Sequence, residues 1–348
     1  MNEENIFQPQ NTPKSTPEKR KRKLNIPALV LLVLSMILLT GCILLAVRCK
    51  NLSKQTSVQA VEEEKEVLEE DGEKVILDTL KSRLSSGGTV MTFLQDYYPD
   101  NIVYVDDGHY IFADKISSLA KNNFENGTFQ KDSNNEITYS ENGTVITHKG
   151  IDVSQFQGNV DYAKVKAAGV EYAIIRLGFR GYGSGTINDD PNFTANMEGA
   201  LQNDIQTGVY FFTQAITKEE AVEEADYVID KIKPYRVTYP IVLDVEEIVG
   251  DTYRQQNLTK DQLTDVIIAF CERVKEKGYT PMIYGNLKCF IGKIDLTRLE
   301  SYDKWFAYYG DKPYYPYEIS MWQYTESGTI DGIEGKVDFN ISFKKFGN

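Results

Sequence analysis

Histidine is almost absent from this chain of 348 residues, which contains only His109 and His148. Both precede the region in which strand and helix patterns alternate, so that region has no imidazole to activate a serine or cysteine, or to bind zinc. Any chemistry there falls to the carboxylates and tyrosines, and no cofactor is expected.

Cysteine is scarce as well, and none of the four cysteines stands in a Cys-x-x-Cys spacing. This excludes a cysteine-held metal and a disulfide scaffold. A bridge between Cys271 and Cys289 stays open, with two buried thiols as the alternative. After residue 50, basic residues are outnumbered by acidic ones, and the net charge of the whole chain is −13. Such an acidic exterior repels phosphate backbones, so no nucleic-acid partner is expected.

One long uncharged run is present, from Ile26 to Val47, directly after the basic run Lys19–Lys23. A helix of this length spans a hydrocarbon core of roughly 30 Å. Basic residues before the span favour a cytoplasmic amino end. We therefore expect a cytoplasmic tail over 1–23, a single-pass transmembrane helix over 24–48 in the cell membrane, and an extracellular remainder.

A second interpretation of this run stays open. Leu39-Thr40-Gly41-Cys42 resembles a bacterial lipoprotein cleavage box, which would leave a lipid on Cys42. The long basic lead-in and the apolar residues that continue beyond Cys42 favour an uncleaved anchor instead. Both interpretations place the rest of the chain outside the membrane and tethered to it.

Two segments separate this run from the alternating region. Acidic residues crowd positions 62–73 and apolar residues then recur at helical spacing, which predicts an acidic helical stalk over 49–85. Glycines at 87 and 88 end that pattern. Short apolar runs divided by Asp-Asp-Gly and Asn-Gly turns predict a small α+β module over 86–148, without a chemical motif.

From residue 149 to 348 the chain alternates between strand and helix patterns. Helical patterns at 160–168, 192–203, 218–232 and 259–277 separate the first five strands, but the last three connections are short. The predicted fold class is α/β, a (β/α) barrel with irregular last three strands. The eight predicted strands are 151–153, 172–177, 207–212, 241–246, 281–284, 305–308, 321–324 and 337–340.

A pair of carboxylates, Asp244 and Glu246, ends the most apolar of these strands. Residues two apart on a strand face the same way, about 6.6 Å apart along the chain. Two partly desolvated acids at this spacing push their pKa values apart, as a general acid beside an ionised carboxylate requires. Asp152 and Asp338, at the ends of the first and last strands, would converge on the same rim.

Several short motifs occur in a fixed order along residues 149–345. They are Gly150–Gly158, Ile174-Ile175-Arg176, Asp190-Pro191-Asn192-Phe193 with Asn196, Gly208-Val209-Tyr210, Asp244-Val245-Glu246, Trp305 with Ala307 and Tyr309, Trp322-Gln323-Tyr324, and Asp338-Phe339-Asn340. The set resembles the Chalaropsis-type lysozymes of glycoside hydrolase family 25, which are N-acetylmuramidases of bacterial walls and phage. Two positions depart from the family pattern, Phe211 and Asp204, and neither belongs to the acidic set.

The resemblance implies hydrolysis of the β-1,4 bond between N-acetylmuramic acid and N-acetylglucosamine in bacterial peptidoglycan glycan strands. Glu246 would be the general acid, and Asp244 would stay ionised. Asp244 would act either as a nucleophile or, as we favour, by orienting the substrate's own 2-acetamido group in a retaining mechanism. Asp152 and Asp338 would complete the catalytic set by tuning Glu246 and binding sugar hydroxyls.

The same resemblance implies a sugar-binding set. Tyr210 and Tyr284 would bond the acetamido group, while Tyr309 and Trp322 would offer aromatic faces to sugar rings. Arg176 would pair with one of the catalytic carboxylates. A non-catalytic wall-binding module with the same fold stays as the alternative function. A chitinase-type barrel is disfavoured because Val242 interrupts the acidic run of that family.

Overall fold

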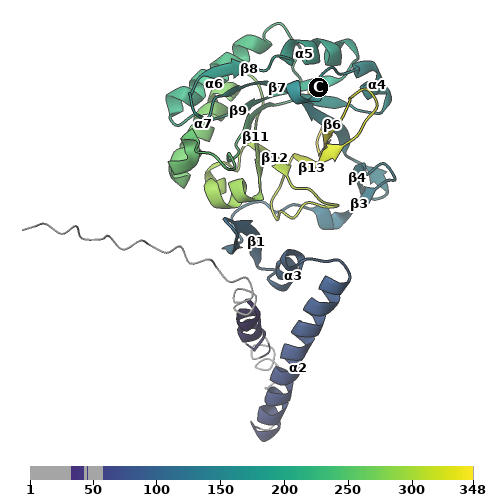
Figure 1. Ribbon diagram of the computed structural model, residues 1–348, viewed down its shortest axis with the longest axis vertical. Helices are drawn as coiled ribbons and strands as arrows, with labels where there is room; N and C mark the ends of the chain where they lie inside the picture. The colour runs from purple at the N-terminus through teal and green to yellow at the C-terminus, as the bar shows by residue number, and fades with distance from the viewer. Residues whose placement is uncertain (1–32, 43–44, 46–57, 348) are drawn as a thin grey trace, which may run out of the picture. The chain divides into compact units, whose positions relative to one another are not determined.

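The structure is a computed structural model that describes residues 33–42, 45 and 58–347 (Figure 1). The chain divides into two compact units, one ending at Leu94 and the other beginning at Gln95. The first unit contains the helical residues 33–42 and helix α2 (Val58–Ser85), and α3 (Val90–Tyr97) begins in it. The helix expected in the stalk region is therefore present as α2.

The predicted membrane span falls mostly on residues that the structure does not describe. Of residues 24–48, only 33–42 and 45 are described, and these are helical. The basic tail over 1–23 lies outside the described residues altogether. Within the ranges that are described, no helix is both long and apolar enough to cross a bilayer.

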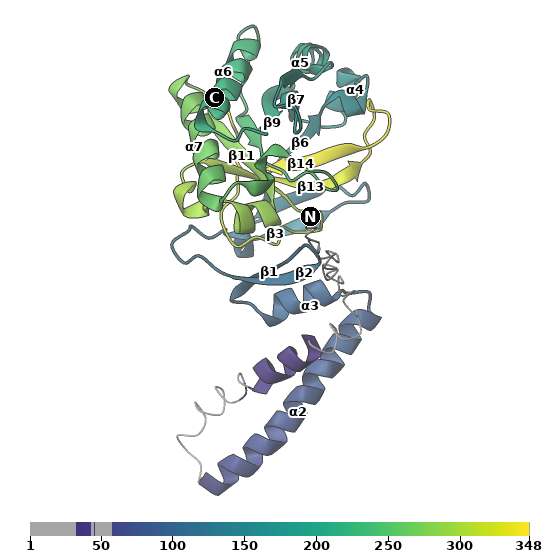
Figure 2. The same cartoon turned by 60° about the vertical axis from the view of Figure 1, so that its left-hand side comes forward.

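Eight strands of the second unit close into the predicted barrel (Figure 1, Figure 2). The first strand pairs with the second on one side and with the last on the other, which closes the ring. The short strand β8 (Ile187–Asp189) folds back on the second of the eight. In order, the eight are β6 (His148–Val153), β7 (Tyr172–Arg180), β9 (Gln206–Phe212), β10 (Ile241–Asp244), β11 (Pro281–Asn286), β12 (Asp303–Ala307), β13 (Met321–Gly328) and β14 (Val337–Ser342).

Four helices follow the first four barrel strands, as predicted, and form an arc outside the ring in Figure 1. Capping explains where two of them start. Thr217 accepts a hydrogen bond from the Glu220 amide, and Thr259 forms a capping box with Gln262. The connection from β11 to β12 contains a short π-helix (Cys289–Lys293) and a 3₁₀ turn (Leu296–Arg298), and the last two connections are loops. The helices are α4 (Tyr162–Ala167), α5 (Phe193–Gln202), α6 (Lys218–Ile232) and α7 (Lys260–Glu276).

The last strand departs from the expected parallel arrangement, because β14 runs antiparallel to both β13 and β6. Only residues 329–336 join β13 to β14, whereas a parallel crossover needs about a dozen residues or more. The reversal puts the start of β14 at the rim where the parallel strands end. Asp338 is therefore paired in register with Asp152.

Side chains on the barrel strands alternate between two apolar layers. On β10, Val242 belongs to a small cluster inside the barrel, while Ile241 and Leu243 belong to the large cluster between strands and helices. Cys271 and Cys289 contribute to the outer layer as free, buried thiols, in line with the second of the two predicted states. A polar side chain two residues after an interior position near the end of a strand, such as Asp244 after Val242, must lie at the barrel mouth.

Residues 95–148 supply two further sheets, which pack against the outside of the barrel. The backbone amide of Val103 donates to the Tyr314 hydroxyl at 3.0 Å, and that of Ile116 donates to the Tyr317 hydroxyl at 2.6 Å. Buried residues of both sheets share the outer apolar cluster. This part of the predicted module is therefore continuous with the barrel. The sheets are β1 (Asn101–Asp106) with β2 (His109–Asp114), and β3 (Gly127–Lys131) with β4 (Ile137–Glu141) and β5 (Thr144–Val145).

Candidate active site

A cavity of about 220 Å³ opens at the carboxyl ends of the parallel barrel strands. It contains the predicted carboxylates and the predicted tyrosines, which come from six of the barrel strands or their ends, with Asp244 and Glu246 both from β10. Three further residues in it, on β12 and β13, were not predicted. The lining residues are Asp152, Tyr210, Asp244, Glu246, Tyr284, Trp305, Tyr309, Gln323, Glu326 and Asp338.

Glu246 lies two residues beyond the end of β10 and is largely withdrawn from water. Burial, together with the nearby Asp338 and Glu326 carboxylates, raises the pKa of Glu246 to about 7. Within the part of the chain that the structure describes, its carboxyl has no hydrogen-bond or ion-pair partner. Glu246 can therefore hold a proton near neutral pH and give it to a bound group.

Asp244, the last residue of β10, is only 6% exposed, and its Oδ1 atom has no partner among the described residues. Burial raises the pKa of Asp244 well above its ordinary value, and Glu246 and Asp152 raise it further. These surroundings disfavour the ionised state that the sequence interpretation expects for Asp244. A buried acceptor without a donor is costly, and a ligand N–H would relieve that cost.

Asp152 and Asp338 form a carboxyl pair across the β6–β14 ladder. Burial and the facing Asp338 raise the pKa of Asp152, while burial also raises the pKa of Asp338 despite its hydrogen bond with Asp152. Such a pair titrates as one unit and holds one proton between two groups over a range of pH.

Two side-chain amides fix the orientation of Asp152. Asn340 Nδ2 donates to Asp152 Oδ2 at 2.7 Å, and Gln323 Nε2 donates to the same oxygen at 2.9 Å. The amide oxygens accept from aromatic side chains: Trp305 Nε1 donates to Asn340 at 2.8 Å, and the Tyr284 hydroxyl donates to Gln323 at 2.9 Å. Trp305 and Tyr284 thus hold the two amides in place, and the amides in turn hold Asp152.

The sequence interpretation missed this network, although the signal for part of it was present. A glutamine between Trp322 and Tyr324 on an apolar strand is costly unless it reaches polar partners. For Glu326 no such signal exists, because register shifts on β13 after Gln323 break the alternation of faces.

The prediction for Trp322 was wrong. It is fully buried in the outer layer, where its Nε1 donates to the Tyr308 carbonyl at 2.7 Å and its ring lies edge-on to Phe129 at 5.5 Å. Because Gln323 faces the cavity, its neighbour on the strand must face away from it. Trp305, whose ring contacts Tyr284 at 4.6 Å, is the tryptophan of the cavity.

The prediction for Arg176 also needs correction. Its Nε donates to Asp190 Oδ2 at 2.6 Å, and it forms no ion pair with any of the five cavity carboxylates. Asp190 follows β8, in a segment whose position the sequence pattern did not indicate. The Arg176 charge still lowers the pKa of Asp244, against the larger effect of burial. Tyr309 is 49% exposed and lines the cavity, and its contact with sugar stays a prediction.

The described His, Cys, Asp and Glu side chains include no group of three or more that could hold a metal ion.

Comparison with known proteins shows the family to which the chain belongs. The sequence pattern of glycosyl hydrolases family 25 matches residues 151–333 of the 348-residue chain. The chain belongs to glycosyl hydrolases family 25.

Its relatives within the family include named lysozymes. The autolytic lysozyme of Clostridium acetobutylicum is 25% identical over 193 residues, which are 55% of each chain. Lysozyme M1 of Streptomyces globisporus is 28% identical over 205 residues, covering 55% of this chain and 66% of that one. The chain thus spans about half to two thirds of the length of these relatives.

Among solved structures, the spore cortex lytic enzyme SleM of Clostridium perfringens is similar to this family 25 chain with a TM-score of 0.50. The two are 25% identical, and the match covers 57% of this chain and 67% of the other. The matched family segment contains β7 to β13 complete, together with the second half of β6, whereas β14 follows its end.

Proposed function

We propose that this chain is a peptidoglycan hydrolase that cleaves the β-1,4 bond between N-acetylmuramic acid and N-acetylglucosamine. Membership of family 25 and the names of its lysozyme relatives support a glycoside hydrolase. The observation that carries the proposal is the Glu246 carboxyl, which keeps a proton to about pH 7 beside Asp244 in a polar cavity. A wall-binding module would gain nothing from such a group.

In the proposed mechanism Asp244 acts through the substrate. Its unpartnered Oδ1 accepts a hydrogen bond from the N–H of the 2-acetamido group at the cleavage point. The acetamido oxygen attacks the anomeric carbon as the bond to the leaving oxygen breaks, and Glu246 gives that oxygen its proton. Water then opens the oxazolinium ring and loses a proton to Glu246, so the anomeric configuration is retained.

The carboxyl pair supports this chemistry electrostatically. Asp338 is one of the two carboxylates that raise the pKa of Glu246, so it keeps the acid protonated before the reaction. Asp152 is held by Asn340 and Gln323 and keeps Asp338 in place. Tyr210, Tyr284 and Tyr309 line the same cavity and present hydroxyl groups and ring faces to the sugar.

The experiment that tests the proposal is mass spectrometry of the fragments released from purified peptidoglycan by the full chain. Reduced fragments ending in muramitol are expected, because the proposed cut leaves N-acetylmuramic acid at the new reducing end. Fragments ending in reduced N-acetylglucosamine would reject the bond assignment. Binding to the wall without any new reducing end would favour the non-catalytic alternative.

The pH dependence gives a further prediction. Glu246 must be protonated to act as the acid, so kcat is expected to fall as pH rises through about 7. Glu326 raises the pKa of Glu246, so Glu326→Gln is expected to move this alkaline limb to lower pH. Initial rates at saturating substrate check both, with circular dichroism at each pH as the folding control. A limb that stays in place in Glu326→Gln contradicts the electrostatic account.

We also propose that residues 24–48 anchor the protein in the cell membrane, with the barrel outside. The uncharged run from Ile26 to Val47 after a basic cluster supports this. Cys42→Ala is expected to leave the full chain in the membrane fraction after a carbonate wash, since an uncleaved helix needs no lipid. Release of that variant into the soluble fraction would identify a lipid anchor instead. Replacement of Cys49, which is outside the cleavage box, is the matched control.

A further inference from the structure

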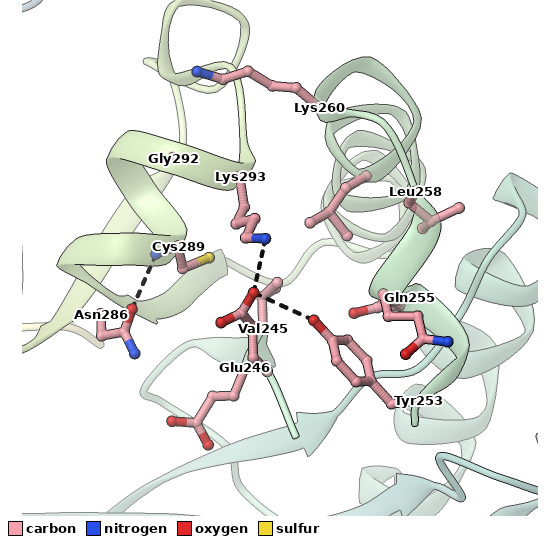
Figure 3. A pocket seen from close by; sticks show the side chains of 13 residues that line it. Val245, Glu246, Tyr253, Gln255, Leu258, Lys260, Asn286, Cys289, Gly292 and Lys293 are labelled. Atoms are coloured by element: carbon pink, nitrogen blue, oxygen red, sulfur yellow. Dashed lines mark hydrogen bonds and ion pairs between the residues drawn. The ribbon is translucent and has the colours of Figure 1, made fainter. Parts of the chain in front are cut away.

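A set of ion pairs lies on the far side of Glu246 from the barrel mouth. It borders a second cavity, of about 190 Å³, whose walls include Glu246, Glu247, Tyr253 and Lys293 (Figure 3). Glu247 is the centre of this set, whose other members come from three separate segments. We call the set of Asp106, Glu247, Tyr253, Lys288 and Lys293 the Glu247 clamp.

The contacts within the clamp are close and mutually reinforcing. Lys293 Nζ lies 2.8 Å from Glu247 Oε1, and the Tyr253 hydroxyl donates to the same oxygen at 3.3 Å. Lys288 Nζ pairs with the other Glu247 oxygen and also with Asp106 Oδ1, the latter at 2.6 Å. All the paired side chains are partly buried, so solvent screens them less than an exposed pair.

The charges of the clamp are stable near neutral pH. The Lys288 ammonium lowers the pKa of Asp106 below its ordinary value. Burial alone would raise the pKa of Glu247, but Lys288 and Lys293 bring it below its ordinary value. Glu247 therefore stays ionised while its neighbour Glu246 holds a proton, and the two acids take opposite states.

Glu246 needs such support because the sheet does not hold it. Strand β10 ends at Asp244, and the Val245 amide makes one more bond, to the Tyr284 carbonyl at 3.1 Å. Glu246 itself has no side-chain partner among the residues described. Figure 3 shows its carboxyl pointing away from Lys293 and Tyr253. Anchoring Glu247 on one side of the backbone therefore presents Glu246 to the other side.

One member of the clamp comes from outside the matched family segment. Asp106 is the last residue of β1, whereas the family match begins at residue 151. Its strand is fixed to the barrel independently, through the bond from the Val103 amide to the Tyr314 hydroxyl. Asp106 can therefore hold Lys288 from a rigid base, and Lys288 in turn holds Glu247.

We propose that the Glu247 clamp positions the general acid, and that the β1–β2 hairpin, through Asp106, is a working part of the active site. This proposal rests on the proposed function of Glu246. Asp106 and Lys288 are positioning residues: they act through Glu247 and do not touch the substrate. A displacement of a catalytic group by about 1 Å can lower a rate by about a hundredfold.

The test compares Asp106→Asn and Lys288→Met in the full chain, assayed for release of reducing ends from soluble glycan strands. We expect kcat to fall by about tenfold in Asp106→Asn and by more in Lys288→Met, with KM changed by less than about threefold. A freed Glu246 gains water, so its pKa should fall and the alkaline limb of kcat should move to lower pH. Asp338 and Glu326, which face Glu246, are unchanged in both variants.

Further variants separate positioning from loss of folding. Lys131→Met is the matched control, because Lys131 and Asp311 also join a strand of residues 95–148 to a barrel loop, at 3.0 Å, but on the exposed surface. It should leave kcat and the pH limb unchanged. Lys288→Arg should restore most of kcat, since a guanidinium can bridge the same two carboxylates. Asp106→Asn should add little in the Lys288→Met background.

The outcomes distinguish the two proposals. Wild-type kcat and an unmoved alkaline limb in both folded variants would overturn the clamp, while an inactive Glu246→Gln would leave the proposed function intact. A fully active Glu246→Gln would overturn the proposed function itself. If kcat fell only in proportion to the melting temperature, and fell equally in Lys131→Met, the ion pairs would have a structural role. This result would also overturn the proposal for the clamp.

Discussion

Replacing Glu246 with glutamine is expected to lower kcat by about a thousandfold or more, with KM little changed. The variant keeps the shape of the side chain but removes the proton that the leaving oxygen must receive. Folding should be unaffected or improved, since the carboxyl is partly buried without a partner among the described residues. Reducing-end release from purified peptidoglycan measures the rate, and thermal unfolding measures the stability.

A change of substrate makes this first test sharper. An aryl glycoside whose phenol is a good leaving group needs little protonation, so Glu246→Gln should lose much less activity on it than on the wall. Equal losses on both substrates would point to a binding role. Glu334→Gln, an exposed change outside the cavity, should leave both rates unchanged. A Glu246→Gln enzyme within about tenfold of the wild type would remove the acid assignment.

Asp244→Asn is expected to lower kcat by about a hundred- to a thousandfold, the size seen when one oriented electrostatic partner of a transition state is lost. The reason is the positive charge that develops on the acetamido group as its oxygen attacks. The Asp244 carboxyl can balance that charge as it accepts the N–H, whereas a neutral amide cannot. Steady-state kinetics on soluble glycan strands measure the effect.

The same residue separates the two mechanisms left open by the sequence. Substrate assistance predicts that a 2-trifluoroacetamido substrate reacts more slowly, because its carbonyl oxygen is a weaker nucleophile. It also predicts no covalent glycosyl adduct in intact-mass spectra of the enzyme under turnover. An adduct mapped to Asp244 would establish the direct nucleophile instead. An Asp244→Asn variant with the wild-type kcat would exclude Asp244 from either role.

The barrel and the convergence of its carboxylates were predictable from local pattern. Asp244 and Glu246 were expected to share one face of a strand over 241–246. Both do line the cavity, although β10 itself ends at Asp244. Asp152 and Asp338 were expected as neighbours, which their register pairing confirms, although β14 runs opposite to the expected direction. The length of the connection before β14 was a usable signal, because residues 329–336 are too few for a parallel crossover.

The wrong predictions, such as that for Trp322, came from residue type alone, without the direction in which the side chain points. Trp322 and Trp305 are the same residue type and both lie on barrel strands, yet only Trp305 faces the cavity. The face to which a strand side chain points depends on its register in the strand, and residue type does not indicate it. Many aromatics of the last third pack against residues 95–148 instead, as the contact between Trp322 and Phe129 shows. The link from Asp106 to Lys288 joins residues far apart in sequence, and no local pattern encodes such a pair.

The antiparallel seam between β6 and β14 has a consequence for when the activity arises. Asp152 sits on the first barrel strand to leave the ribosome, and Asp338 on the last. A growing chain that ends before residue 337 lacks one wall of the cavity and half of the carboxyl pair. The cavity therefore takes its full form only after the last barrel strand has paired with the first.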